Sequence, residues 1–360
     1  MGENIFYVDN NKKKNNTAGA KAPDDIASLC LNAGYTPLIM PTFPSGYIQK
    51  KIWLATRCVF FWWKVLKTLP IGAFLIYQHP IYGIRIAEKM IPRIQKEKNI
   101  KCVCLIHDLN SLRGDIAGVA HCNKKTAEIA DNVLLKHFDI VICHNEHMRQ
   151  YMIEQGFAEN RLINLEIFDY LTDCKMADHI KNSKPTIAIA GNLASEKCGY
   201  IYDIVHPELN KNTGLIINLY GVNYDQKKAS NNMVYKGSFN PEELPGILDG
   251  DFGLVWDGPV AKTCAGNSGE YLRYNNPHKT SLYLVAGIPV IVWSQAAIAD
   301  FVIKNGVGIT VDRLENLEES IRLVSNISYA RMCENVKRIG KKLADGYYFK
   351  NAIKVALGRE

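Results

Sequence analysis

The amino-acid sequence predicts an α/β protein with two doubly wound domains that face each other across a cleft. Short, continuous apolar runs alternate with helical patterns along the first half of the chain, which is typical of strands buried in a parallel sheet. The polar, turn-rich stretch TDCKMADHIKNSKP, residues 172–185, interrupts this alternation, and the same alternation then resumes. With 360 residues the chain is longer than a single hydrophobic core usually supports, so two domains agree with its length.

The first predicted domain covers residues 1–172. Pro23 and Asp24 suit the first turn of its first helix, where proline loses no hydrogen bond and an acid faces the positive helix start. We expect Pro92 to kink or end a later helix, because proline removes a backbone donor. The expected strands are 4–9, 36–43, 73–80, 100–109 and 139–145, the expected helices are 23–33, 52–66, 82–98, 123–138 and 146–157, and the segment 161–170 closes the domain.

The second predicted domain covers residues 185–328 and repeats the same alternation. Its expected strands are 186–193, 214–221, 233–239, 251–256, 288–293 and 307–311, and its expected helices are 199–205, 241–248, 277–286, 296–306 and 314–324. The remaining residues, 329–360, are basic and aromatic with helical patterns. We expect them to form helices that pack back towards the N-terminal domain.

The segment NNPHKT, residues 275–280, stands directly in front of an apolar helix. Asn276 can cap this helix, and Pro277 fits its first helical position. Free backbone N–H groups and the helix dipole attract phosphate at such a start, and Lys279 adds a full positive charge. A lysine in the first turn is mildly unfavourable for the helix itself, because the helix dipole is positive there. Its presence therefore favours an anionic ligand at this position. The alternative is an ordinary capped helix with an exposed lysine.

Small and polar residues also follow other strands of the second domain, where doubly wound folds bind ligands. Gly191 allows a close backbone approach, and Asn192 and Ser195 offer hydrogen bonds. Asp257 stands just beyond the buried strand 251–256. Residues that could supply a stacking face and polar contacts for a nucleobase are Tyr220, Ser238 and Phe239. Plain turns and core aromatic residues are the alternatives for these sets.

Acid–base candidates end strands of the first domain. His107 and Asp108 follow one strand, and either side chain could remove a proton from an acceptor hydroxyl, with His79 as a reserve. A helix cap or an internally satisfied polar pair is the alternative. Ala18 and Gly19, in TAGAKAPDD, could wrap a phosphate or a sugar. The sequence has no GxGxxG and no Walker A motif, so it predicts neither a dinucleotide fingerprint nor a P-loop.

Aromatic and basic residues are interleaved at residues 50–67. A helix that lies in a membrane interface has this composition. A subunit contact in a homo-oligomer, a docking surface and partial burial in the core are the alternatives. We expect no signal peptide, and no uncharged apolar run approaches the ~20 residues of a spanning helix.

The composition narrows the class of partner. The formal charge of +7 suits a polyanionic partner, an anionic membrane face or a phosphorylated substrate. Ten cysteines without a CxxC pair or a zinc-type spacing indicate buried, reduced thiols of a cytosolic protein. We expect no nucleic-acid partner.

Taken together, DFGLVWDG, YLRYNNPHKTSLYLVAGIPVIVW, AAIADFVIKNGVGITV and the early AGAKAPDDI resemble the bacterial β-galactofuranosyltransferase family. They also resemble the related glucosyltransferases that extend sugars on serine-rich adhesins. The resemblance is strongest over residues 250–312 and continues through 5–25 and 100–110. It implies the glycosyltransferase-B fold of two Rossmann-like domains, with a UDP-sugar as donor and without a metal or another cofactor.

The resemblance also implies roles for individual residues. The residues implied to hold the diphosphate and ribose are Asn275, Asn276, Pro277, His278, Lys279 and Thr280. Asn192, Ser195 and Ser238 would contribute to the nucleotide pocket, and the loop at Ala18 and Gly19 would reach the donor from the first domain. No DxD metal motif is evident. The acidic ribose clamp of retaining relatives is not evident either, although Glu270 lies close by, so an inverting or a retaining outcome stays open.

We therefore expect a cytoplasmic enzyme, at the inner face of the plasma membrane, that moves galactofuranose or glucose from a UDP-sugar to a saccharide acceptor. The acceptor would belong to bacterial surface polysaccharide or glycoconjugate synthesis, and the basic aromatic helix favours a lipid-linked one. Asp108 is the first candidate for the base. One alternative is a non-catalytic nucleotide-sugar-binding subunit that supports a partner enzyme, and another is an epimerase.

Overall fold

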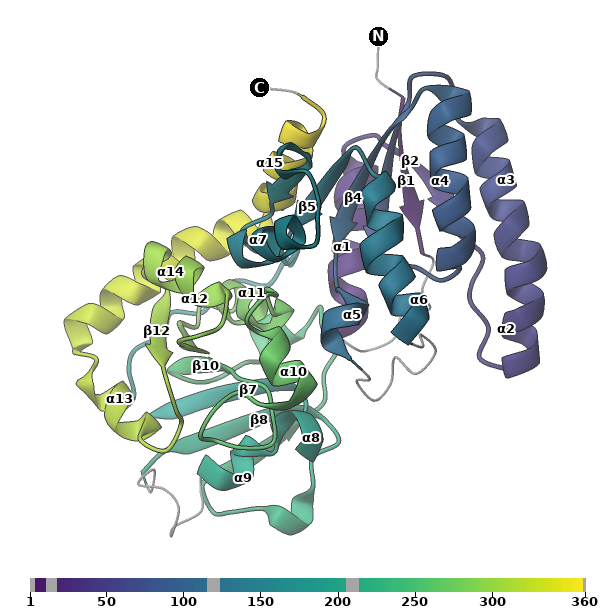
Figure 1. Ribbon diagram of the computed structural model, residues 1–360. Helices are drawn as coiled ribbons and strands as arrows, with labels where there is room; N and C mark the ends of the chain where they lie inside the picture. The colour runs from purple at the N-terminus through teal and green to yellow at the C-terminus, as the bar shows by residue number, and fades with distance from the viewer. Residues whose placement is uncertain (1–3, 11–17, 115–123, 205–213, 359–360) are drawn as a thin grey trace. The chain divides into compact units, whose positions relative to one another are not determined.

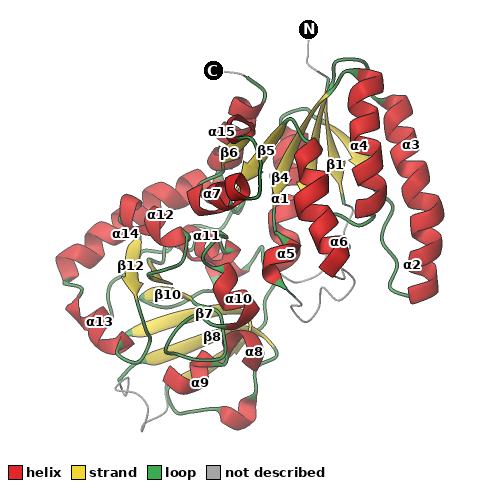
Figure 2. Ribbon diagram, in the orientation of Figure 1, coloured by secondary structure: helices red, strands yellow, loops and turns green. Residues whose placement is uncertain are grey.

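The computed structural model describes residues 4–10, 18–114, 124–204 and 214–358, and the chain forms two compact units (Figure 1). The N-terminal unit comprises Met1–Asn15, Ala22–Leu165 and Phe349–Glu360, and the C-terminal unit comprises Asn16–Lys21 and Glu166–Tyr348. Each unit contains a six-stranded parallel sheet with helices on both sides (Figure 2). The predicted class, two doubly wound α/β domains, is confirmed.

The sheet of the N-terminal unit has the strand order β2-β1-β3-β4-β5-β6. Its strands are β1 (Ile5–Asp9), β2 (Thr36–Ile39), β3 (Phe74–His79), β4 (Lys101–Ile106), β5 (Ile140–Cys143) and β6 (Leu162–Asn164). The central strands β3 and β4 are buried along almost their whole length, as their continuous apolar runs predict. The closing segment 161–170 contributes only the short edge strand β6.

Helices on both sides of this sheet differ from the sequence-based prediction at two prolines. Helix α1 begins at Ala18, ahead of Pro23, and α4 continues through Pro92. Packing explains α4, because one face of the helix is buried on both sides of the proline and tertiary burial outweighs the lost hydrogen bond. The helices are α1 (Ala18–Asn32), α2 (Tyr47–Trp53), η1 (Leu54–Cys58), α3 (Val59–Thr68), α4 (Ile84–Lys98), α5 (Asn110–Arg113), α6 (Lys124–Glu128), η2 (Ile129–Val133), η3 (Leu134–His137), α7 (Glu146–Glu154) and η4 (Glu159–Arg161).

The sheet of the C-terminal unit has the strand order β12-β11-β10-β7-β8-β9. Its strands are β7 (Thr186–Asn192), β8 (Ile216–Val222), β9 (Met233–Gly237), β10 (Phe252–Val255), β11 (Val290–Trp293) and β12 (Gly308–Val311). The expected burial of β10 is found along its whole length. Gly253 in this strand is required by packing, since a Cβ there would lie 2.2 Å from the ring of Tyr283.

The helices of the C-terminal unit connect and cover these strands. They are α8 (Ser195–Cys198), α9 (Tyr200–Ile204), η5 (Gln226–Lys228), η6 (Leu244–Gly246), α10 (Gly266–Tyr271), α11 (His278–Val285), α12 (Ile298–Asn305), α13 (Leu317–Leu323) and α14 (Asn326–Ala344), and α15 (Tyr347–Ala356) follows. Tyr283 of α11 links the central strands β7 and β10, because its hydroxyl accepts a hydrogen bond from the backbone N–H of Ala190 at 2.8 Å and donates to the carbonyl of Leu254 at 3.4 Å. Within the described residues no helix is long and apolar enough to cross a bilayer.

The unit boundaries differ from those expected at 172 and 329. The division falls after Leu165, because the segment that follows is bonded to the C-terminal unit: the hydroxyl of Ser281 donates to the carbonyl of Phe168 at 2.5 Å. Helix α14 also belongs to the C-terminal unit, and only Phe349–Glu360 of the final segment belongs to the N-terminal one.

Candidate functional site

The order of the C-terminal sheet creates a point at which the chain changes direction. From β7 the chain continues to β8 and β9 on one side, and it then returns to β10 on the other side of β7. Parallel sheets bind ligands outside the carboxyl ends of their strands at such a switch point. The segments that follow β7 and β10 therefore flank the expected binding position in this unit.

Two lysines share one buried carboxylate at the switch point. Nζ of Lys279, in α11, lies 2.6 Å from Oδ1 of Asp257, and Nζ of Lys197, in α8, lies 3.6 Å from Oδ2. Lys279 also donates to the carbonyl oxygen of Trp256 at 2.8 Å. The carboxylate orients both ammonium groups but balances only one of them, so Lys197, Asp257 and Lys279, the switch-point cluster, keep an excess of positive charge.

The start of α11 differs in detail from the expected capped helix. The helix begins at His278, and Pro277 occupies the N-cap position without a side-chain cap. The amide of Asn276 does not cap the helix but donates to the carbonyl of Glu166 at 3.0 Å. The N–H groups of His278 and Lys279 therefore have no capping side chain, which is the arrangement that favours an anion, whereas the N–H of Thr280 donates to the carbonyl of Pro277 at 2.9 Å.

Two polar atoms of the same segment are buried without a hydrogen-bond partner among the described residues. They are Oδ1 of Asn275 and Oγ1 of Thr280. A buried, unpaired acceptor or hydroxyl costs about 1–3 kcal/mol, so native proteins rarely leave one without a use. Their position at the start of α11 is consistent with a ligand that supplies the missing partners.

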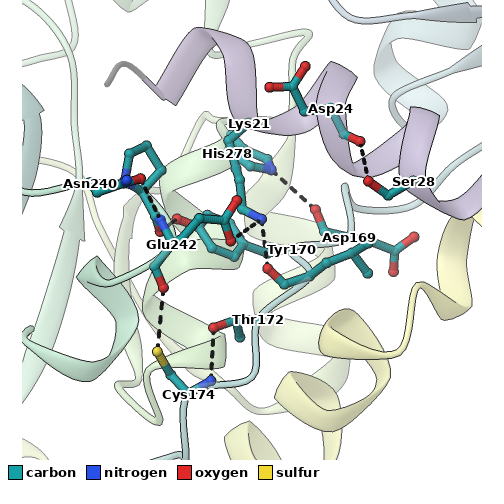
Figure 3. Close-up of polar contacts among 12 residues, drawn as sticks. Lys21, Asp24, Ser28, Asp169, Tyr170, Thr172, Cys174, Asn240, Glu242 and His278 are labelled. Atoms are coloured by element: carbon teal, nitrogen blue, oxygen red, sulfur yellow. Dashed lines mark hydrogen bonds and ion pairs between the residues drawn. The ribbon is translucent and has the colours of Figure 1, made fainter. Parts of the chain in front are cut away.

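The ring of His278 is used within the chain (Figure 3). Its Nε2–H donates to the carbonyl of Asp169 at 3.1 Å, and the ring stacks on Tyr170 with centroids 4.9 Å apart. Burial, the largest cause, lowers the pKa of His278 to about 4, although the bond to Asp169 acts in the opposite direction. His278 is therefore neutral at pH 7 and holds the segment after Leu165 against α11.

Lys21 joins the same group of side chains (Figure 3). Its Nζ donates to the carbonyl of Leu171 at 2.7 Å and to Oε2 of Glu242 at 3.0 Å, and it lies 4.9 Å from the centroid of the Tyr170 ring. The ammonium group is buried, so its charge is balanced by one carboxylate and one aromatic face. Ala18 and Gly19 open the same helix, and the contacts of these two residues lie outside the described part of the structure.

Glycines bring the ends of β7 and β8 close together. A Cβ on Gly221 would lie 1.7 Å from the carbonyl oxygen of Gly191, so only glycine fits there. Asn192 is exposed, and its side-chain oxygen accepts hydrogen bonds from the N–H of Ala194 at 3.1 Å and from Asn223 at 2.9 Å. Ser195 is the first residue of α8, next to the switch-point cluster in sequence.

The three residues expected near a nucleobase are placed differently from one another. The ring of Tyr220 is buried in the core, where its hydroxyl accepts a bond from the N–H of Asp249 at 3.0 Å, so the expectation of an open stacking face at Tyr220 is corrected. Ser238 is exposed and Phe239 is partly exposed, directly after β9. Only these last two can meet a ligand without a rearrangement.

The acid–base candidates of the N-terminal unit are held by neighbouring side chains. Nε2–H of His107 donates to Oε1 of Gln78 at 2.7 Å. The carboxylate of Asp108 forms a short ion pair with Arg113 of α5. Both residues lie at the carboxyl end of β4, as predicted, and both side chains are partly exposed.

A buried pair lies at the end of the adjacent strand. Nε2 of His79 is 2.8 Å from Oδ1 of Asp131, and the other oxygen of Asp131 accepts a bond from the N–H of Ser111 at 2.6 Å. Both side chains are almost completely buried, which makes His79 a structural residue in this state. Asp131 was not among the predicted residues, because an acid in an amphipathic helical pattern gives no sign that it points inward.

Sequence reasoning also missed Lys197. The signal was present, since this lysine lies two residues after Ser195, just beyond a strand end that was already under consideration. Glu270, named for a ribose clamp, forms an exposed ion pair with Arg273 at 2.8 Å. No group of three or more metal-binding side chains occurs in the described ranges.

Family comparisons agree with this two-unit architecture. The model described as "Glucosyltransferase 3-like, N-terminal domain" matches residues 5–167, and "Glucosyltransferase 3-like, C-terminal domain" matches residues 187–356. Among solved structures, Anabaena Alr3699/HepE in complex with UDP superposes with a TM-score of 0.60 at 11% identity, covering 98% of each chain. The apo lipopolysaccharide outer core galactosyltransferase WaaB superposes with a TM-score of 0.61 at 12% identity, covering 98% of this chain and 99% of that one.

Two curated relatives are closer in sequence than these structures. The β-1,6-galactofuranosyltransferase WbbI of Escherichia coli (strain K12) is 36% identical over 260 residues, which is 70% of each chain. Glucosyltransferase 3 of Streptococcus gordonii is 25% identical over 338 residues, which is 92% of each chain. The chain therefore belongs to the glucosyltransferase 3-like family of glycosyltransferases and has the glycosyltransferase-B fold.

Proposed function

We propose that this protein transfers a hexosyl group from a UDP-sugar to a saccharide hydroxyl. The observation that carries the proposal is the switch-point cluster, in which Lys197 and Lys279 surround Asp257 with an excess of positive charge at the binding position of the C-terminal sheet. Transfer breaks the bond between the anomeric carbon and the diphosphate, and the leaving UDP takes the negative charge. Oriented ammonium groups stabilise that charge as it develops, which is often the largest single contribution to catalysis.

The donor contacts divide between phosphate, ribose and base. Lys197, Lys279 and the first-turn N–H groups of α11 would face the diphosphate, with Asn275 and Thr280 supplying polar contacts. The residues left for the ribose and base are Gly191, Asn192, Ser195, Ser238 and Phe239. Pro277 fixes the helix start, and Asn276 and His278 fix the segment beside it. Ala18 and Gly19 stay proposed donor contacts from the start of α1.

Galactofuranose is the donor sugar that the sequence similarity favours. WbbI, whose name specifies galactofuranosyl transfer, is 36% identical over 70% of this chain. Glucose is the second candidate, supported by the lower identity of 25% to glucosyltransferase 3 over a longer part of the chain, 92%. A screen of both UDP-sugars, read out as released UDP with a panel of saccharide acceptors, decides between them.

Asp108 is the proposed base for the acceptor hydroxyl. The hydroxyl proton would pass to its carboxylate while the acceptor oxygen bonds to the anomeric carbon. In the free state the carboxylate is paired with Arg113, so binding of the acceptor must displace or reposition that guanidinium. His107 is the second candidate, at the preceding residue of the same strand end.

We expect the reaction to need no metal ion. The switch-point cluster can supply the charge that a divalent cation provides at other diphosphate sites. Turnover should therefore be the same in EDTA as in Mg²⁺ or Mn²⁺, and a loss of at least tenfold in EDTA that either cation restores would contradict this.

The acceptor we propose is a lipid-linked saccharide at the cytoplasmic face of a membrane, as part of bacterial surface polysaccharide synthesis. This choice is supported by the exposed aromatic and basic helix surface of the N-terminal unit.

The screen of UDP-sugars and acceptors also tests whether the protein is a catalyst, because a non-catalytic binding subunit would bind UDP but release none from any donor. An epimerase would interconvert the UDP-sugars without an acceptor, and a homo-oligomer is compatible with either result.

A further inference from the structure

The helical segment from α2 through η1 to α3 carries an unusual set of exposed apolar side chains. It lies at the outer edge of the N-terminal unit in Figure 1. The exposed apolar residues, which we call the α2–α3 surface, are Tyr47, Ile48, Ile52, Val59, Phe60 and Trp63. Phe60 is 62% exposed and Trp63 is 49% exposed, although large aromatic side chains are usually buried in the core of a soluble protein.

Other aromatic residues of the segment face the core. Trp53, Phe61 and Trp62 are buried, and Trp62 packs against Tyr77 of the central strand β3 with ring centroids 6.4 Å apart. The structure thus separates one aromatic-rich sequence into a core face and a solvent face. A test of the surface must therefore change Phe60 and Trp63 and leave Trp62 in place, because a change at Trp62 would disturb the fold.

The π-helical segment η1 aligns the two halves of this surface. Ile52 precedes η1 and Phe60 follows it, eight residues later. Two turns of α-helix take about 7.2 residues, and a π-turn adds about one, so eight residues bring the chain back to the same face. In an uninterrupted α-helix these two side chains would be offset from each other.

The charge of the surface has one sign. No Asp or Glu occurs from Ile26 to Ala87, and the charged residues of that stretch are Lys50, Lys51, Arg57, Lys64, Lys67 and Arg85. Lys51 lies 4.5 Å from the ring centroid of Tyr47, and Lys67 lies 5.7 Å from that of Trp63. Glu97 of α4 interacts electrostatically with one of these lysines. Its pKa is lowered mainly by the hydrogen bond from Arg93 and to a smaller degree by the charge of Lys67.

The surface continues towards the strand ends of the N-terminal unit. Phe43, after β2, stacks on Tyr82, after β3, with ring centroids 3.7 Å apart and an interplanar angle of 8°. Lys50 lies 5.7 Å from the centroid of Phe43. Aromatic and basic groups therefore extend from the helix surface to the carboxyl ends of the strands, where this type of sheet binds its ligands.

We propose that the α2–α3 surface lies in the interfacial region of a bilayer that contains anionic lipids. Apolar side chains would enter the headgroup boundary, and the flanking lysines and arginine would contact lipid phosphates. A second copy of the chain is a poorer occupant, because a two-fold contact through this face would set basic residues against basic residues. Binding of the α2–α3 surface to a membrane does not depend on which donor sugar the protein uses. Only the idea that this binding brings the protein to a lipid-linked acceptor rests on the proposed function.

Co-sedimentation of the full-length protein with vesicles tests the proposal. We expect the wild type to pellet with vesicles of phosphatidylethanolamine and phosphatidylglycerol and to stay in solution with phosphatidylcholine alone. The double variants Phe60→Ala/Trp63→Ala and Lys51→Ala/Lys64→Ala should each bind the anionic vesicles at least tenfold more weakly, since each basic residue near such a surface contributes about fivefold. Salt at 0.5 M should weaken wild-type binding by screening, on the order of the effect of the lysine variant.

Matched variants outside the surface serve as controls. Leu323 and Ile327 are 79% and 77% exposed in the C-terminal unit, so Leu323→Ala/Ile327→Ala removes similar exposed apolar area. Lys304→Ala/Lys341→Ala removes two exposed lysines from helices of the same unit. Both controls should pellet like the wild type. Equal pelleting of all variants would overturn the proposal, and so would loss of a wild-type oligomer in Phe60→Ala/Trp63→Ala with vesicle binding unchanged. UDP release, measured separately, distinguishes either result from failure of the proposed function.

Discussion

The strand ends of the two units contain similar residue types but use their charges in opposite ways. In the C-terminal unit, Lys197 and Lys279 share the single carboxylate of Asp257, so positive charge is left over for a ligand. In the N-terminal unit, the carboxylate of Asp108 forms an ion pair with Arg113, and the ring of His79 lies against the carboxylate of Asp131. The cluster in the C-terminal unit therefore keeps positive charge for an anion, whereas Asp108 and His79 at the strand ends of the N-terminal unit already have partners within that unit.

The two units would therefore respond differently to a bound substrate. An excess of oriented charge can receive a diphosphate without breaking any contact. An ion pair must first be opened, so the base proposed at Asp108 would become available only when the acceptor replaces Arg113. Acceptor binding would then both position the hydroxyl and free the carboxylate that removes its proton.

Replacing Asp108 should have the largest effect on turnover. We expect Asp108→Ala to lower kcat by about 10²–10⁴-fold, the usual contribution of a general base, with the donor KM changed only a few-fold. Initial rates of UDP release at saturating acceptor measure this. Glu154→Ala, an exposed acid of the same unit, is the matched control. If Asp108→Ala retained wild-type turnover while His107→Ala lost it, the base would be His107.

Replacing Lys279 should have the next largest effect and tests the charge excess directly. We expect Lys279→Met to lower kcat by about 10²–10³-fold, as removal of one group that stabilises a developing charge commonly does. Calorimetry should show weaker binding of UDP and unchanged binding of uridine, which lacks the diphosphate. Lys304→Met is the control. An equal loss for UDP and uridine would mean that Lys279 supports the fold of the site rather than the phosphates.

The stability of the C-terminal unit should depend on pH through His278. Its pKa is about 4 when folded, below the ordinary 6.5, so its neutral form stabilises the folded state. This contribution is complete above pH 6.5 and is lost as the pH falls towards 4. Between pH 7 and pH 5 the loss should reach at most about 2 kcal/mol. The free energy of unfolding of wild type and His278→Gln, measured by urea titration at both pH values, should differ in its pH dependence by that amount, and parallel curves would contradict it.

The sequence predicted the strand ends well because continuous apolar runs and the residues after them are local features. The segment at 275–280, Asp257 and the residues after β4 all lie where the pattern placed them. The start of α1 and the passage of α4 through Pro92 were not predictable, since burial of a helix face outweighed the proline. Local propensity could not reveal that balance.

Side-chain partners were the other feature that the sequence could not supply. From their position at a helix start, the side chains of Asn276 and His278 could equally well contact a ligand or form hydrogen bonds within the chain. The structure assigns both to the carbonyls of residues 166 and 169, which are more than a hundred positions away in the chain. The pairing of Lys279 with Asp257 was equally hidden, because no spacing rule connects a helix start to the end of a different strand.

Replacing Lys197 should have the smallest effect and tests whether the two lysines act as one group. Its Nζ lies 3.6 Å from Asp257, farther than that of Lys279, and its side chain is more exposed, so Lys197→Met should weaken UDP binding by only about threefold to tenfold. The double variant Lys197→Met/Lys279→Met should lose more affinity than the two single effects multiplied, because Asp257 is then a buried carboxylate with neither lysine beside it. Adding Asp257→Asn to the double variant should recover part of that excess loss. Strict multiplication of the single effects, measured by calorimetry, would show that the lysines act separately and that the shared carboxylate does not couple them.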